Sequence, residues 1–154
     1  MAFKYVSPLT IEQVNEFRDF AERFLSEPYT LYTYRFFTEQ YADCCVGVYD
    51  TDSDKLVGGA ICKVNFNSVG YIGMIAVDPD YRGHGLGSKI LEYVIQAFTR
   101  RKLNSIELEV EICNVPAIAL YEKYGFHKVT LFDDYYLTGQ GAYRMTKELT
   151  PLSS

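Results

Sequence analysis

Alternate glycines at the junction of a strand-like and a helix-like segment form the part of the sequence best suited to bind an anion. The stretch Val77–Gly87 reads Val-Asp-Pro-Asp-Tyr-Arg-Gly-His-Gly-Leu-Gly. Glycines let backbone amides approach an anion closely, and the start of the following helix adds unsatisfied N–H donors and a partial positive charge. Arg82 adds a permanent cation. We therefore predict a pyrophosphate cradle, with a flexible glycine loop as the alternative. The spacing matches neither a Rossmann fingerprint nor a Walker A loop.

A strand with three regularly spaced glutamates offers a second place for chemistry. Side chains alternate along Ile106–Ile112, so its apolar residues face one way and Glu107, Glu109 and Glu111 face the other. Carboxylates about 7 Å apart along one face create a local negative field, which attracts an ammonium group. A solvated sheet face is the alternative. The preceding glycine loop and the nearby Tyr121 favour the functional interpretation.

Tyr121 lies on a short predicted helix after this strand and could act as a proton donor. A phenol is a weak acid with a pKa of about 10, so it can give a proton to a departing thiolate. A core aromatic is the alternative, since the chain has 14 tyrosines. Neither His84, inside the glycine loop, nor His127, at a predicted strand start, is assigned a catalytic role.

The elements that must hold these residues alternate between strand and helix in the second half of the chain, which is typical of an α/β sheet. Thr10-Ile11-Glu12-Gln13 has the capping-box pattern of a helix start. The predicted helices are Thr10–Leu25, Leu31–Tyr41, Leu86–Arg101 and Ala117–Tyr124. The predicted strands are Phe3–Val6, Cys44–Tyr49, Leu56–Asn65, Val69–Val77 and Ile106–Ile112, with two more within Phe126–Leu149 around a loop from Phe132 to Gly141. We expect one α/β domain over residues 1–154, a mixed twisted sheet of about six to seven strands flanked by about four helices.

The composition is that of an ordinary globular protein. With 15 basic and 20 acidic side chains the net charge is −5, which disfavours DNA or an anionic membrane as the main partner. No apolar run approaches the roughly 18 residues of a membrane span, and Met1–Tyr5 opens no signal peptide, so we expect a cytoplasmic protein. The cysteines form no C-x-x-C pair, and no metal site is expected. Cys45, Cys62 and Cys113 lie in apolar stretches and are interpreted as reduced, buried thiols, with disulfides as the alternative.

Two motifs resemble the signatures of the GNAT superfamily of N-acyltransferases. Arg-Gly-x-Gly-x-Gly after a Val-Asp-Pro-x-Tyr turn resembles its acetyl-CoA-binding motif, and Asn114-x-x-Ala117-x-x-Leu120-Tyr121-x-x-x-Gly125-Phe126 resembles its second signature. Further segments resemble the catalytic subunits of the N-terminal acetyltransferase C (NatC) complex. They are Leu25-Ser26-Glu27-Pro28-Tyr29, Tyr32-x-Tyr34-Arg35-x-Phe37, Gly70-Tyr71-Ile72-Gly73-Met74, Leu108-Glu109-x-Glu111 and Tyr135-Tyr136-Leu137. The chain departs from that family at Asp133 and Asp134, where basic residues are usual, and at Glu39-Gln40-Tyr41, which replaces an Asn-Trp-Pro stretch.

The resemblance implies acetyl transfer from acetyl-CoA to a protein α-amino group, by direct attack in a ternary complex. It implies Glu109 as the base, acting directly or through water, and Tyr121 as the acid beside the CoA sulfur. It also implies that the sheet splays after Val69–Val77, with acetyl-CoA on one side and peptide on the other. Asn114 would cap a short helix and hold the pantetheine arm. The implied acceptor is a nascent chain that retains methionine before a bulky apolar residue, and the implied partners are two auxiliary subunits and the ribosome.

The same resemblance assigns the remaining site residues. Those for acetyl-CoA are Ile75, Ala76, Val77, Arg82, Gly83, His84, Gly85, Leu86, Gly87, Ser88, Asn114 and Tyr121. Those for the peptide are Leu25, Glu27, Pro28, Tyr29, Tyr71, Met74, Glu111, Tyr135 and Tyr136. The tyrosines among them offer aromatic walls with little rotamer entropy, and packing in the core is the alternative for each. Two alternatives stay open, an acetyltransferase of another acceptor class and a non-catalytic acetyl-CoA-binding subunit.

Overall fold

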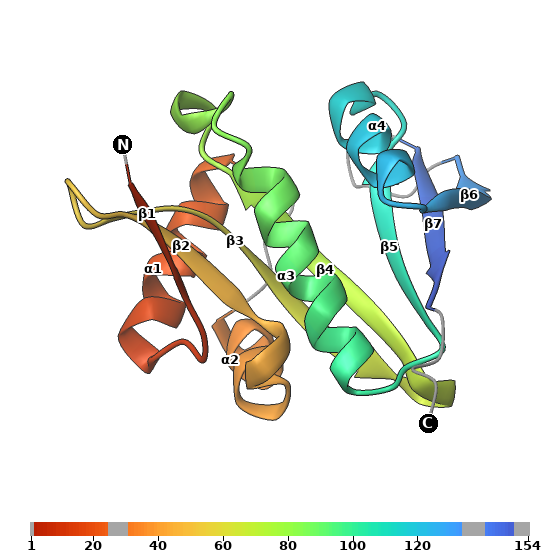
Figure 1. Ribbon diagram of the computed structural model, residues 1–154, viewed down its shortest axis with the longest axis horizontal. Coiled ribbons are helices and arrows are strands. Elements are labelled where there is room, and N and C mark those ends of the chain that lie inside the picture. The colour runs from red at the N-terminus through yellow and green to blue at the C-terminus, as the bar shows by residue number, and fades with distance from the viewer. Residues whose placement is uncertain (1, 25–30, 134–140, 150–154) are drawn as a thin grey trace. The chain divides into compact units, whose positions relative to one another are not determined.

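Seven strands joined by backbone hydrogen bonds, and four α-helices, make up the fold of the described residues (Figure 1). The computed structural model describes residues 2–24, 31–133 and 141–149. The helices are α1 (Ile11–Phe24), α2 (Leu31–Gln40), α3 (Leu86–Arg100) and α4 (Val115–Lys123). The strands are β1 (Phe3–Val6), β2 (Val46–Asp50), β3 (Lys55–Asn65), β4 (Val69–Val77), β5 (Ser105–Glu111), β6 (His127–Phe132) and β7 (Ala142–Glu148). Their order in the sheet is β1-β2-β3-β4-β5-β7-β6, and both parallel and antiparallel pairs occur. The predicted mixed sheet is confirmed.

The chain divides into two compact units. The first unit comprises Met1–Lys63 and Gly73–Ala97, and the second comprises Val64–Ile72 and Phe98–Ser154. The first half of β4 therefore belongs to the second unit, and the rest of β4 belongs to the first. Each unit carries one of the two groups of residues that the sequence singles out, the glycine loop in the first and the acidic strand in the second.

In the first unit, α1 and α3 cover opposite faces of β3. The predicted capping box starts α1, because the Thr10 amide donates to the Gln13 side chain at 2.9 Å and the Gln13 amide donates to the Thr10 hydroxyl at 3.1 Å. A Cβ on Gly59 would lie 2.7 Å from the Phe17 ring of α1, whereas one on the neighbouring Gly58 would lie 3.3 Å from Ile90 of α3. Adjacent strand residues face opposite sides, so a helix packs on each side.

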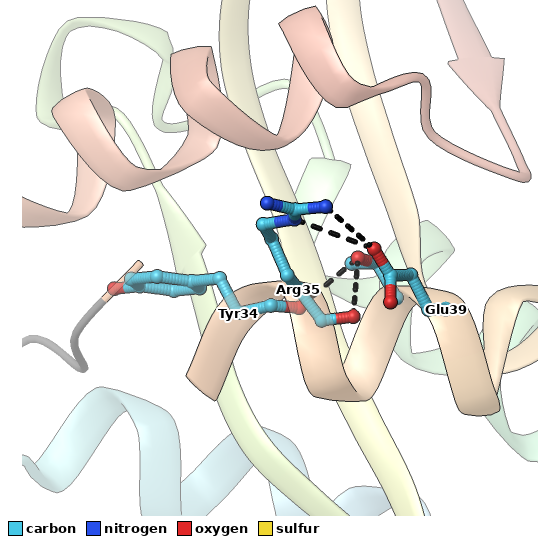
Figure 2. Close-up of polar contacts among 4 residues, drawn as sticks. Tyr34, Arg35 and Glu39 are labelled. Carbon is cyan, nitrogen blue, oxygen red and sulfur yellow. Dashed lines mark hydrogen bonds and ion pairs between the residues drawn. The ribbon is translucent and has the colours of Figure 1, made fainter. Parts of the chain in front are cut away.

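Helix α2 joins the apolar core on the α1 side of this unit. Tyr34 is fully buried and its hydroxyl lies 3.4 Å from the sulfur of Met74 on β4. The outer side of α2 carries an ion pair, in which Arg35 lies 3.2 Å from Glu39 (Figure 2). Thr38 is also buried, and its hydroxyl donates to the Tyr34 carbonyl at 3.0 Å, so this hydroxyl is satisfied by the backbone of its own helix.

In the second unit, the acidic strand β5 lies between β4 and β7. It pairs in parallel with β4, from Val69 opposite Ser105 to Ile72 opposite Leu108. It pairs with the whole of β7 in the antiparallel direction, and β6 pairs with the outer side of β7. The predicted alternation along β5 is confirmed at Ile106, Leu108 and Val110, which are all buried. The predicted splay of the sheet after β4 stays a prediction.

Three predictions about local structure are corrected. The strand predicted from Cys44 begins at Val46, because Ala42–Cys44 forms a short 3-10 turn. The strand predicted to reach Ile112 ends at Glu111, whose carbonyl accepts a hydrogen bond from the Asn114 amide and so turns the chain. That turn leaves Ile112 41% exposed and also exposes Cys113, which was expected to be buried. Cys44, Cys45 and Cys62 are buried free thiols, and burial raises the pKa of Cys62.

Candidate active site

The glycine loop of the first unit has the backbone geometry that an anion cradle requires. Asp78 accepts a hydrogen bond from the Asp80 amide at 2.9 Å and caps the short turn that leads into the loop. Gly83 and Gly85 then adopt left-handed conformations, with φ of +85° and +73°, and a Cβ on either would meet no protein atom within 4 Å. Helix α3 starts at Leu86, and its first amides have no partner inside the helix. Residues 82–85 are exposed, so the cradle is open to solvent.

Buried polar contacts anchor this loop at its base. The Tyr81 hydroxyl donates to the carboxylate of Asp50 at 2.9 Å, and the Asp52 amide donates to the same carboxylate at 2.9 Å. The Lys55 ammonium lies 3.4 Å from Asp78, whose side chain is also buried. The amide of Asp52 lowers the pKa of Asp50, and the bond to Tyr81 acts in the same direction. The hydrogen bond to Asp50 and burial raise the pKa of Tyr81. Sequence reasoning missed Asp50 because it lies at the end of β2, far from the glycine motif in the sequence.

The other residues assigned to acetyl-CoA lie at the edges of the loop. Ile75, Ala76 and Val77 end β4 and are half-buried, Leu86 is buried, and Gly87 and Ser88 are partly exposed in the first turn of α3. His84 is exposed, and its Nδ1 lies 3.1 Å from the Tyr81 carbonyl. Their roles stay predictions, and the open left-handed glycines are the feature that fits a pyrophosphate.

In the second unit, side chains from three adjacent strands converge on Glu109. The Tyr71 hydroxyl, from β4, donates to Glu109 Oε1 at 3.0 Å. Arg144, directly opposite Glu109 on β7, places its Nη2 3.5 Å from the same oxygen. Only 8% of the Glu109 side chain is exposed, so this carboxylate is neither solvated nor isolated. Glu107 on the same face is 3.4 Å from the Asn65 side-chain amide. Arg144 was missed, since the register of β5 on β7 cannot be read from either strand alone.

Asn114 and Tyr121 hold helix α4 in the same unit. The Asn114 side chain accepts a hydrogen bond from the Ala117 amide at 3.3 Å, which confirms it as the N-cap. Tyr121 is 6% exposed and its ring centroid lies 5.9 Å from that of Phe126. The Tyr121 carbonyl also accepts from the Phe126 amide at 3.0 Å. Tyr121 is thus well ordered by packing, and its predicted role as an acid stays a prediction.

The residues assigned to the peptide are only partly brought together. Tyr71 contacts Glu109, whereas Met74 is buried against Tyr34 in the core of the first unit. Glu111 lies at the end of β5, with Oε2 3.6 Å from the Cys113 sulfur. The remaining six lie outside the described residues: Leu25, Glu27, Pro28, Tyr29, Tyr135 and Tyr136. No group of three potential metal ligands occurs among the described residues, and no helix there is long and apolar enough to span a membrane.

Residues 12–126, which hold both the glycine loop and Glu109, match the sequence profile of the acetyltransferase (GNAT) family. The chain belongs to this family. Within it, N-alpha-acetyltransferase 30 of Saccharomyces cerevisiae is 35% identical over 149 residues, covering 92% of this chain and 85% of the relative. The ribosomal protein bS18-alanine N-acetyltransferase of Escherichia coli is 40% identical over 91 residues, covering 59% of this chain and 61% of the relative. This acetyltransferase therefore groups with the N-alpha-acetyltransferase 30 proteins.

The same grouping is found among solved structures. A chain of the NatC complex, crystallised with a Gag peptide and CoA, superposes with a TM-score of 0.91 at 34% identity. The alignment covers 97% of this acetyltransferase and all of that chain. The predicted family and the predicted α/β fold are both confirmed.

Proposed function

We propose that this acetyltransferase transfers the acetyl group of acetyl-CoA to the N-terminal α-amino group of proteins that begin with methionine and a bulky apolar residue. The observation that carries the proposal is the buried, hydrogen-bonded carboxylate of Glu109, in a chain that groups with N-alpha-acetyltransferase 30. The proposal includes auxiliary subunits, nascent chains at the ribosome and a cytoplasmic location. Its partners are supported by the NatC complex, in which a similar chain assembles with other subunits.

The residues of the glycine loop fit acetyl-CoA. When bound, acetyl-CoA supplies an activated thioester carbonyl. The left-handed Gly83 and Gly85 leave open space where side chains would stand, and the first amides of α3, which follows directly, have no partner inside the helix and are available to an anion. Arg82 is exposed beside them and adds a cation for the phosphates. The base of the loop is already held by the hydrogen bonds of Asp50, Tyr81 and Asp78. The loop therefore loses little conformational entropy when acetyl-CoA binds.

Glu109 and Tyr121 have complementary tasks in the transfer. The amine nitrogen forms a bond to the acetyl carbon as the carbon–sulfur bond breaks. A carboxylate oxygen of Glu109 takes the proton that the nitrogen loses, directly or through water, and the Tyr121 hydroxyl gives a proton to the sulfur. An α-amino group has a pKa of about 8, so a substantial minority is neutral at pH 7 and the base needs to do only modest work. Holding amine and thioester in a near-attack geometry is then the larger contribution.

A ribosomal-protein N-terminus is the second candidate acceptor. The relative named for bS18-alanine acetylation matches at 40% identity, although over a shorter stretch than the N-alpha-acetyltransferase 30 relatives. The acidic strand suits both acceptors, because both present an α-amino group. The choice between them depends on the side chains of the first two residues, which the peptide-binding segments must recognise.

Acetylation of short peptides that differ only in their first two residues tests the proposal. Burying a large apolar side chain gains about 1.5–3 kcal/mol, and about 1.4 kcal/mol is tenfold in rate, so a Met-Leu peptide should exceed a Ser-Ser peptide at least tenfold in kcat/KM. A Met-Ser peptide isolates the second position, and an Ala-Ser peptide represents the alternative acceptor, an N-terminal alanine. The panel is run with the chain alone and with co-expressed auxiliary subunits. A preference for Ser-Ser or Ala-Ser would overturn the acceptor assignment, and absence of turnover in every arrangement would overturn the catalytic one.

A further inference from the structure

The face of the sheet that carries Glu107, Glu109 and Glu111, the acidic face, also carries an arginine, Arg144, which has no role in the proton transfers. It lies directly opposite Glu109 in the antiparallel pairing of β5 and β7, so both side chains extend from the same face of the sheet. The Arg144 Nη2 lies 3.5 Å from Glu109 Oε1. The Arg144 side chain is 36% exposed and the Glu109 side chain 8%, so a partly buried basic side chain lies against an almost wholly buried acidic one. A cation in this place offsets part of the cost of burying the carboxylate.

The Arg144 side chain contacts Glu109 and the Phe132 ring among the described residues. Its guanidinium carbon lies 5.4 Å from the Phe132 ring centroid, within the range of a cation–π contact. Its one polar side-chain contact among the described residues is Glu109. Its Nε is buried without a hydrogen-bond partner there, although an unpaired buried donor is costly. Among the described residues, the polar contact of the Arg144 side chain is therefore with this single carboxylate.

Tyr71 and Arg144 act on one atom from two sides. Both contacts fall on Glu109 Oε1, one from β4 and one from β7, the strands on either side of β5. Two contacts on the same oxygen restrict rotation of the carboxylate about its last bond. Proton transfer requires the accepting oxygen within hydrogen-bond reach of the proton, so a fixed carboxylate plane matters for the chemical step.

We propose that Arg144 is a positioning residue, which holds the Glu109 carboxylate in the orientation that accepts the proton of the acceptor amine. The proposal rests on the proposed role of Glu109 as the base. It also assigns a charge balance to the acidic face, because Arg144 prevents the glutamates from trapping the amine as a tightly paired ammonium. Loss of Arg144 therefore slows the chemical step without weakening the attraction between this face and a cationic N-terminus.

The test compares Arg144→Gln with the unsubstituted enzyme, in whichever subunit arrangement gives turnover with a Met-Leu peptide. We expect kcat to fall about tenfold while KM for the peptide does not rise and acetyl-CoA affinity is unchanged. A purely structural defect would raise KM and lower the melting temperature. Arg144→Lys, which keeps the charge, should recover part of the loss. Lys147→Gln is the matched control, since Lys147 lies on the same strand but the opposite face and contacts none of these residues.

A double substitution separates this proposal from the assignment of the base. If Arg144 works through Glu109, then Arg144→Gln should have no further effect on kcat in a Glu109→Gln background. Equal losses in both backgrounds, or an unchanged kcat in Arg144→Gln alone, would overturn the proposal while leaving the base in place. Full activity of Glu109→Gln would instead overturn the base. Should Arg144→Gln not fold, Arg144→Met keeps an unbranched side chain in this place and provides the same measurements.

Discussion

The glycine loop and the acidic face are built in opposite ways. The loop is contiguous in sequence and its working parts are backbone amides, so a single segment from Asp78 to Ser88 contains nearly all of it. The acidic face is assembled from three strands, and the partners of Glu109 lie 38 and 35 residues away from it. The loop is fixed by the φ angles of two glycines, whereas the face is fixed by strand register. The geometry of the glycine loop therefore depends on neighbouring residues in the sequence, whereas that of the acidic face depends on how distant strands pair.

This difference predicts how each region fails. A backbone cradle loses affinity when its conformation is restricted, and the identity of most neighbouring side chains matters little. A side-chain cluster loses rate when one atom changes, and the fold is hardly affected. Substitutions in the loop should therefore change the affinity for acetyl-CoA, and those on the acidic face should change kcat.

The largest expected effect belongs to Glu109→Gln. Glutamine keeps the shape and can still accept the Tyr71 hydroxyl, but it cannot take a proton, so kcat should fall by about 10²–10⁴. The affinity for acetyl-CoA, measured by calorimetry, should be unchanged. Glu107→Gln is the matched control, because Glu107 lies on the same strand and face but pairs with Asn65. Full turnover of Glu109→Gln at pH 7 would make Glu111 or a water relay the better candidate.

Gly85→Val should give the next largest effect, on acetyl-CoA affinity. Valine in the left-handed conformation costs about 1–2 kcal/mol, so binding should weaken about tenfold or more. The fold should survive, because a Cβ at Gly85 meets no protein atom within 4 Å. Gly85→Asn tests the reason, since asparagine tolerates this conformation. If the two substitutions weaken acetyl-CoA binding equally, the volume of the side chain rather than the backbone conformation is responsible. An unchanged affinity in a folded Gly85→Val variant would contradict the assignment of this loop as the pyrophosphate cradle.

The same contrast explains what the sequence could predict. The capping box at Thr10 and the bounds of β4 follow from local patterns, and both are present as predicted. The alternation along β5 is also local, and it placed Glu109 correctly on the face opposite the buried residues. Arg144 could not be foreseen, because its pairing with Glu109 depends on the register of a strand that lies 35 residues further along the chain. Cys113 was misplaced for a related reason, since a turn after Glu111 overrides the apolar pattern.

Tyr81→Phe should give a smaller effect, confined to the loop. It removes the hydrogen bond to Asp50, and a hydrogen bond contributes about 0.5–1.5 kcal/mol. If that bond fixes the loop, KM for acetyl-CoA should rise about two- to tenfold with kcat unchanged. Tyr49→Phe is the control, because its hydroxyl contacts Glu16 on α1 and not the loop. A fall in kcat without a change in KM would mean that Tyr81 acts on the chemical step. That result would contradict the expectation that substitutions in the glycine loop change only the affinity for acetyl-CoA.

The smallest effect concerns stability at acid pH and also originates beneath the loop. The amide of Asp52, with help from the Tyr81 hydroxyl, lowers the pKa of Asp50 below its ordinary value of about 3.9. A group whose pKa is lowered by folding stabilises the native state above its unfolded pKa, and this contribution disappears as the pH falls through the lower, folded pKa. The free energy of unfolding, measured with urea, should therefore differ between the unsubstituted enzyme and Asp50→Asn by a constant amount from pH 7 to about pH 5.

Below about pH 4 that difference should shrink, because the Asp50 carboxylate takes up a proton in the unfolded state before it does so in the folded state. Asp52→Asn provides the matched control, since it removes a carboxylate from the same turn and keeps the amide that Asp50 accepts from. A difference that stays constant down to pH 3 would mean that Asp50 stabilises the turn by shape rather than by charge. In that case the charge of Asp50 would not contribute to anchoring the glycine loop, and its hydrogen bond from Tyr81 would not be needed to explain the stability of the loop.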